Sequence, residues 1–161
     1  MGYITKILIL LIVFSLPKLG WTQVDRPKLN SFINQNQNQI QPEPLSIEEA
    51  FPYFVSELSP GKYEVMWSLA PGHYLYRHAF KFALLQTKES EEQPVDFILP
   101  DGLKKVDQFF GQIEAYYEKI TVDLSLQTVP GPEAKIIIQY QGCADWGFCY
   151  PPQKGLFKLH P

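Results

Sequence analysis

Short segments of alternating apolar and polar residues constrain the fold of this chain more than any other feature. In residues 62–69 every second side chain is apolar, and residues 120–126 repeat the pattern. A period of two residues is typical of a β-strand with one buried face. Turn signals such as Pro71-Gly72 separate these segments. The sequence therefore predicts an all-β fold, an antiparallel immunoglobulin-like β-sandwich of about seven or eight short strands.

The individual elements can be placed from the same pattern. Ser46 and Glu49 form the capping-box pair of a helix that Pro52 limits to about one turn. Residues 104–111 lack the alternation, and we expect an irregular segment there. The expected strands cover residues 53–58, 62–69, 74–85, 95–99, 114–126, 134–140 and 154–160.

The first 22 residues have the composition of a secretory signal peptide. Lys6 precedes the unbroken apolar run 7–14, and small residues follow before Thr22, where we expect cleavage. An uncleaved membrane anchor is the disfavoured alternative, because spanning a bilayer takes about 20 apolar residues. Export places the protein in an oxidising compartment, where two nearby cysteines persist as a disulfide.

Residues 23–44 are expected to form a disordered linker, and residues 45–161 the folded domain. The stretch 34–44, NQNQNQIQPEP, contains almost nothing to bury. Without residues 1–22 the chain carries 12 Lys and Arg against 17 Asp and Glu, a net charge of −5. No basic cluster remains, which argues against nucleic acid and anionic membrane surfaces as partners.

Both cysteines of the sequence, Cys143 and Cys149, lie in the segment 141–152, QGCADWGFCYPP. Its glycines permit a tight loop and its two prolines end it, so the sulfur atoms lie close enough to meet. The pair is either redox-active or a structural staple. Closing a loop of about seven residues restricts the unfolded chain by only about 2.3 kcal/mol in the loop-entropy treatment, a small gain for a staple.

The same segment, with Tyr140 before it, resembles the active-site segment of the N-terminal periplasmic domain of the DsbD thiol:disulfide interchange proteins. Two upstream stretches agree, GHYLYRHAF at 72–80 and DQFFG at 107–111, and the second resembles the cap loop of that family. The resemblance covers residues 45–160. It implies a periplasmic domain that performs thiol–disulfide exchange between proteins without a cofactor.

The resemblance also implies the partners and the roles of the two thiols. In the family, a thioredoxin-like domain or protein donates electrons, and a periplasmic disulfide isomerase or a cytochrome-maturation thiol protein accepts them. Cys149 corresponds to the residue that joins the partner and Cys143 to the one that resolves; spacing alone does not distinguish them. The family's membrane and thioredoxin-like parts are missing from these 161 residues. We therefore expect either a stand-alone homologue or a truncated sequence.

The residues around the pair follow from the resemblance as well. Phe109 is the ring expected to cover the disulfide, although it can also be an ordinary loop anchor. Gln108 and Phe110 depart from the acidic residue and the tyrosine of the family, so we expect shielding but no acid–base help from this loop. The implied cap loop is Asp107, Gln108, Phe109, Phe110 and Gly111. The implied neighbours of the cysteines are Tyr74, Tyr76, Asp145, Trp146, Phe148 and Tyr150, of which the two strand tyrosines can equally be core residues.

The rival hypothesis is a non-redox immunoglobulin-like binding module whose structural disulfide makes a recognition loop rigid. The loop between the cysteines contains no Lys, Arg or His, and Asp145 disfavours a thiolate. We therefore expect the pKa of reduced Cys149 at or above the ordinary value of about 8.5. His73 and His78, combined with the thiols, fit no standard zinc spacing, and we expect no metal site.

Overall fold

The computed structural model describes residues 42–159. The predicted signal peptide and nearly all of the predicted linker lie outside the described residues. The domain opens with helix α1 (Ile47–Ala50), whose capping box forms as the sequence predicts: the Glu49 N–H donates to Ser46 Oγ and the Ser46 N–H to Glu49 Oε2. Within residues 42–159, no helix is both long enough and apolar enough to cross a membrane.

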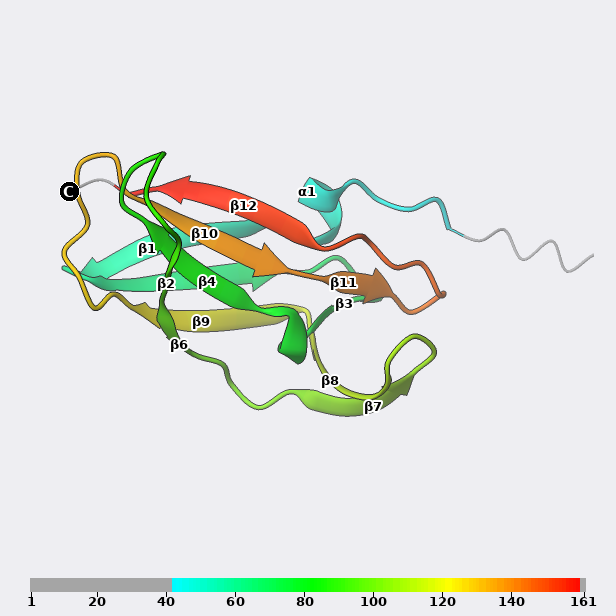
Figure 1. Cartoon of the computed structure of the whole chain (residues 1–161). Coiled ribbons are helices and arrows are strands. Elements are labelled where there is room, and N and C mark those ends of the chain that lie inside the picture. Colours follow the sequence, from blue (N-terminus) through cyan, green and yellow to red (C-terminus); the bar gives the residue numbers. More distant parts are fainter. Residues whose placement is uncertain (1–41, 160–161) are drawn as a thin grey trace, which may run out of the picture. The chain divides into compact units, whose positions relative to one another are not determined.

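The strands form three antiparallel sheets, each of four strands (Figure 1). The first sheet has the order β1-β2-β9-β6, with β1 (Tyr53–Ser59), β2 (Lys62–Ser68), β9 (Lys119–Ser125) and β6 (Asp96–Ile98). The second has the order β12-β10-β4-β5, with β12 (Gln153–Lys158), β10 (Lys135–Tyr140), β4 (Lys81–Leu85) and β5 (Gln93–Pro94). The third has the order β11-β3-β8-β7, with β11 (Gly142–Ala144), β3 (His73–Tyr76), β8 (Gly111–Tyr117) and β7 (Leu103–Asp107).

The first two sheets pack face to face around an aromatic core. Trp67, on β2, is fully buried, and its ring meets those of Phe80, next to β4, and Tyr140, on β10, at centroid distances of 5.2 and 5.7 Å. Edge-to-face contacts of this kind are favoured by the charge distribution of aromatic rings. The prediction of an immunoglobulin-like antiparallel sandwich is confirmed.

The third sheet continues the strands of the other two at one end of the sandwich (Figure 1). Strand β8 runs into β9 through Glu118, whose φ of 57° bends the chain, and β10 runs into β11 through Gln141. A 3-10 turn, Arg77–Ala79, separates β3 from β4. The predicted strands 74–85 and 114–126 are therefore each two strands that lie in different sheets. These two divisions, together with β5, β7 and β11, which the sequence did not predict, give twelve strands within the described residues against the predicted seven or eight.

The expectation of an irregular segment at 104–111 is wrong. Strand β7 runs to Asp107, a three-residue turn follows, and β8 begins at Gly111. The alternation pattern missed this strand because its polar residues are the more buried ones and its apolar residues are exposed. Lys105 is half-buried and Asp107 buried, whereas Val106 is exposed. Polar side chains thus face inward along β7, and this inward polar face builds the site.

Candidate functional site

The two cysteines are joined in a disulfide at the end of the third sheet, with a Cα–Cα distance of 4.0 Å. Cys143 lies in β11, and a tight turn returns the chain to Cys149. In that turn the Gly147 N–H donates to the Ala144 carbonyl at 2.9 Å, and the Ala144 N–H donates to the Phe148 carbonyl at 2.7 Å. Gly147 has a φ of 95°, which a residue with a side chain rarely adopts. The compact loop that the glycines predicted is confirmed.

The two sulfur-bearing residues differ in accessibility. Cys143 is completely buried in a small cluster with Tyr74, Tyr76, Ile113 and Ala115. Cys149 is partly exposed. A molecule that approaches from solvent therefore reaches the Cys149 side of the disulfide first.

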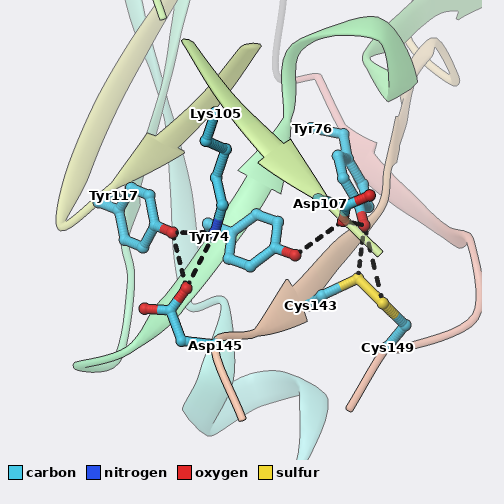
Figure 2. A network of polar contacts seen from close by, with 8 residues as sticks. All are labelled: Tyr74, Tyr76, Lys105, Asp107, Tyr117, Cys143, Asp145 and Cys149. Atoms are coloured by element: carbon cyan, nitrogen blue, oxygen red, sulfur yellow. Dashed lines mark hydrogen bonds and ion pairs between the residues drawn. A yellow bond between two sulfur atoms is a disulfide. The ribbon is translucent and has the colours of Figure 1, made fainter. Parts of the chain in front are cut away.

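A tyrosine hydroxyl connects the disulfide to a buried carboxylate (Figure 2). Tyr76, on β3, places its hydroxyl 2.9 Å from Cys143 Sγ and 3.7 Å from Cys149 Sγ. The same hydroxyl donates to Asp107 Oδ2, and the Tyr74 hydroxyl donates to that oxygen at 2.9 Å. Because a phenol has one proton, the Tyr76 proton has two competing acceptors, the carboxylate and the sulfur.

Asp107 is buried but remains ionised at neutral pH. Burial raises the pKa of its carboxyl, and this is outweighed by hydrogen bonds from Tyr76 and Tyr74 and from the backbone N–H groups of Phe110 and Phe109, which together lower it. The two N–H donors lie 2.6 and 2.9 Å from Asp107 Oδ1. For Tyr76, burial first and then the bond to Asp107 raise the pKa well above its ordinary value. The negative charge of Asp107 is thus separated from the disulfide by the Tyr76 hydroxyl.

A second polar cluster lies on the other side of Tyr74 (Figure 2). Lys105 Nζ is 2.6 Å from the Tyr117 hydroxyl, 3.0 Å from Asp145 Oδ1 and 3.9 Å from the centre of the Tyr74 ring. The Tyr117 hydroxyl donates to Asp145 Oδ1 at 2.7 Å. Asp145, whose nearby charge was expected to disfavour a thiolate, pairs with this lysine. The carboxylate that reaches the sulfur atoms through a hydrogen bond is Asp107.

The remaining aromatic residues of the predicted site lie in or next to the cysteine loop, residues 143–149. Trp146 meets His73 edge to face at 4.9 Å, and Phe148 meets Tyr150 at 4.8 Å. Tyr150 is buried, with its hydroxyl 3.2 Å from His73 Nε2 and donating to the Leu45 carbonyl at 3.1 Å. These ring contacts join the cysteine loop to His73 and Tyr150.

The segment that resembled a cap loop is the β7–β8 hairpin turn, residues 107–111, here called the cap turn. Gln108 Nε2 donates to the Gly147 carbonyl at 3.4 Å, which links the cap turn to the cysteine loop. The Phe110 ring meets Tyr76 at 5.0 Å and His78 at 5.1 Å. Phe109 is about half exposed, at 49%. Gly111 closes the hairpin with a φ of 72°. The shielding role expected of Phe109 stays a prediction.

Sequence reasoning missed two functional candidates, Lys105 and Tyr117. Neither lies in a recognisable motif, and their meeting with Asp145 depends on strand pairing. A strand assignment at 103–107 would have placed Lys105 on the same face as Asp107 and revealed the first of them. Tyr117 follows from the register in which it opposes Tyr74 across β8 and β3.

The fold and the site together define an immunoglobulin-like sandwich with a half-accessible disulfide in a corner lined by tyrosines and a carboxylate. The family described as thiol:disulfide interchange protein DsbD, N-terminal, matches residues 41–161. This chain belongs to that family.

Individual relatives agree with the assignment. A DsbD protein of Colwellia psychrerythraea is 35% identical over 130 residues, which cover 81% of this chain and 20% of that protein. DsbD 2 of Pseudomonas aeruginosa is 34% identical over 155 residues, which cover 96% of this chain and 24% of that protein. The chain thus spans about a fifth to a quarter of the length of these relatives.

Solved structures show the same fold. The reduced DsbD N-terminal domain of Neisseria meningitidis superposes with a TM-score of 0.62 at 25% identity, covering 73% of this chain and 90% of that one. The DsbD N-terminal domain of the same organism has also been solved in its complex with the PilB N-terminal domain; that structure gives a TM-score of 0.58 at 24% identity. The second likeness supports the fold alone.

Proposed function

We propose that this chain is a periplasmic thiol–disulfide exchange module that passes reducing equivalents through Cys143 and Cys149. The observation that carries the proposal is the asymmetry of the disulfide: one residue is accessible, and the other is buried with its sulfur 2.9 Å from the Tyr76 hydroxyl. An accessible sulfur receives the attack, and the Tyr76 hydroxyl lies where it can donate to the buried sulfur as that sulfur leaves.

The proposed thiol–disulfide exchange takes place in two steps. A thiolate of the reduced partner attacks Cys149 Sγ; a bond forms between the two proteins, the Cys143–Cys149 bond breaks, and the electron pair leaves on Cys143 Sγ. The partner's second thiolate then attacks its own sulfur in the mixed disulfide and releases Cys149 as a thiolate. The partner is oxidised to a disulfide and this chain is reduced by two electrons. Both thiolates take up protons from solvent. Passing the electrons on reverses these steps with an oxidised acceptor.

Tyr76 and Asp107 influence how readily Cys143 leaves as a thiolate. As Cys143 Sγ becomes negative, the Tyr76 hydroxyl can turn its proton from Asp107 to the sulfur, and hydrogen bonds to charged acceptors are stronger than those to neutral ones. The Asp107 charge opposes the new thiolate and competes for the same proton. The cysteine pair therefore stays unactivated until a docked partner changes the contacts of Tyr76 and Asp107.

The partners proposed for this module are a thioredoxin-like donor and, as acceptor, a periplasmic disulfide isomerase or a cytochrome-maturation thiol protein. The complex of the Neisseria relative supports the idea that such domains act by docking with another protein. The classification as a protein-disulfide reductase, the periplasmic location and the signal peptide belong to the same proposal.

The alternative is a structural disulfide in a binding module. Against it stand the short sequence separation of six residues, which constrains the unfolded chain little, and the partial exposure of Cys149. A staple gains nothing from a hydroxyl and a buried carboxylate arranged beside one of its sulfur atoms. The geometry favours exchange.

The redox potential separates these two functions. We expect equilibration of the folded domain with glutathione or dithiothreitol buffers to give a midpoint above about −300 mV, within the range of exchange proteins. The fraction reduced is measured by alkylation and mass shift. A midpoint clearly below about −300 mV would assign the disulfide to the structural class.

A further inference from the structure

The cap turn and the cysteine loop, residues 143–149, are joined by polar contacts on both sides of the site. On one side, Lys105 Nζ contacts Asp145 Oδ1 at 3.0 Å. On the other, Gln108 Nε2 donates to the Gly147 carbonyl at 3.4 Å. A crevice of about 300 Å³ lies between the two segments, and its lining includes Lys105, Gln108 and Asp145. Polar contacts, and not apolar packing, therefore join the two segments across this crevice.

The Lys105 contact is positioned to control the cap turn. Lys105 precedes by two residues Asp107, whose carboxylate binds the N–H groups of Phe109 and Phe110. Asp145 follows Cys143 by two residues. The lysine thus connects the strand that ends in the cap turn to the loop that carries the disulfide (Figure 2). A movement that carries the end of β7 and the cap turn away from the cysteine loop must stretch or break this connection.

The Lys105 cluster has more contacts than an ordinary surface ion pair, and its lysine is less exposed. The Lys105 side chain is only 24% exposed, its ammonium lies over the Tyr74 ring, and Tyr117 binds both members of the pair. Burial keeps the ammonium from being fully screened by salt. The pair of Lys154 and Glu92, in contrast, is about half exposed on both sides and lies in another part of the domain.

We propose that Lys105 is a positioning residue that holds the cap turn against the cysteine loop through Asp145, and so limits the access of reductants to Cys149. The inference rests on the proposed function, in which the pair must be reached by a docked protein and protected from small thiols. Opening of such a local element is a low-energy fluctuation, and an ionic latch shifts its equilibrium toward the closed state. A partner that displaces Asp145 from Lys105 would open the site on docking.

A neutral reductant tests the latch without electrostatic steering. Tris(hydroxypropyl)phosphine attacks a disulfide sulfur, both cysteines become thiols, and the phosphine takes an oxygen atom from water. We expect Lys105→Met, which keeps an apolar stem, to raise the reduction rate about three- to ten-fold. Asp145→Asn should raise it by a similar factor. The double variant should reach the same rate as either single variant, because both remove one contact.

Matched variants separate positioning from general destabilisation. Lys105→Arg retains the positive charge and should return the rate to within about two-fold of the wild type, and Lys154→Met, which breaks an unrelated ion pair, should leave it unchanged within the same margin. Because Asp145 is about half exposed, salt screens part of the pair, so raising the salt concentration should modestly speed reduction of the wild type and leave Lys105→Met unaffected. Tyr117→Phe removes one hydroxyl and should give a smaller rise, about two-fold. Asp145→Asn, which changes a half-exposed side chain, keeps the test valid if Lys105→Met fails to fold.

A wild-type reduction rate in folded Lys105→Met, or additive effects in the double variant, would overturn the latch. Failure of the latch and failure of the proposed exchange function give different results. A structural disulfide would still show the Lys105 effect with phosphine, but its potential would lie below about −300 mV. An exchange disulfide without a latch would show the higher potential and no Lys105 effect.

Discussion

The two ends of this domain are built from the same kind of strand but packed by different chemistry. In the sandwich, β2, β9, β4 and β10 enclose a core of aliphatic and aromatic side chains centred on Trp67. In the third sheet, the inward faces of β3 and β7 carry tyrosines, a lysine and an aspartate around the buried Cys143. Stability comes mainly from apolar burial in the first region, whereas the second is held by hydrogen bonds whose proton positions can change.

Because the two regions are packed differently, the fold depends mainly on the sandwich and the proposed exchange on the third sheet. A core packed by rings does not rearrange when a distant disulfide is reduced. A corner held by Tyr76, Asp107 and Lys105 can redistribute a proton or release a contact when the charge on sulfur changes. Substitutions in the two regions should therefore have different consequences, in stability for one and in reactivity for the other.

The largest effect on stability is expected in the sandwich. Trp67→Ala should reduce the free energy of unfolding by about 3–5 kcal/mol, because it removes a fully buried ring. Trp67→Phe should cost less, since Trp67 Nε1 has no hydrogen-bond partner among the described residues and its removal leaves none unsatisfied. Urea unfolding measures both. A loss below about 1 kcal/mol for Trp67→Ala would mean that the core is not centred on this residue.

The next effect concerns Asp107. Asp107→Asn should reduce the free energy of unfolding by about 1–3 kcal/mol, because it weakens four hydrogen bonds to a charged acceptor. The pKa of Asp107 is lowered by folding, so its contribution is present above the unfolded value of about 3.9 and is lost as the pH falls through the folded value. Wild-type stability should accordingly decline more steeply in acid than that of the variant. Equal slopes below about pH 4 would contradict the role of the ionised carboxylate.

A third prediction concerns the reduced thiols. With Asp107 one hydroxyl away and no cation in direct contact with either sulfur among the described residues, we expect the pKa of reduced Cys149 at or above about 8.5. Asp107→Asn should lower that pKa by about one unit, equivalent to about 1.4 kcal/mol. The dependence of alkylation rate on pH gives both values. A wild-type midpoint below about 7 would show that the corner activates the thiolate.

The smallest effect on stability is expected at the cap turn. Phe109 is about half exposed, so Phe109→Ala should change the free energy of unfolding by less than about 0.5 kcal/mol. If its ring shields the disulfide, reduction by dithiothreitol should become about two- to five-fold faster, with a smaller gain for a protein partner that already displaces the turn. Stopped-flow reduction by both reagents compares them. Unchanged dithiothreitol rates would make Phe109 a packing residue only.

The sequence predicted the sandwich well, because its strands bury one face and expose the other. The alternation in 62–69 and 120–126 corresponds to β2 and β9, which pair with each other. The alternation of apolar and polar residues failed to predict β7, where the inward face is polar. It also failed at the two junctions where alternation continues through a change of sheet, at the 3-10 turn Arg77–Ala79 and at Glu118.

The site was predictable only in part. The cysteines and their neighbours lie in a contiguous motif, so the resemblance located them. Lys105 and Tyr117 reach Asp145 through the pairing of β7 with β8 and of β8 with β3, a tertiary arrangement that no local pattern encodes. The pairing of Asp145 with a lysine was missed for the same reason, because its partner comes from another strand.

Trapping of the mixed disulfide tests the exchange mechanism most directly. Cys143→Ser leaves the accessible Cys149 without its resolving thiol, and we expect it to accumulate a stable mixed disulfide with a thioredoxin-like partner. Cys149→Ser leaves only the buried Cys143 and should trap at least about ten-fold less, because thiol exchange depends on access. Non-reducing electrophoresis and mass spectrometry measure the yields. Reversed yields would exchange the two roles, and no trapping by either variant would contradict the account and favour the structural disulfide.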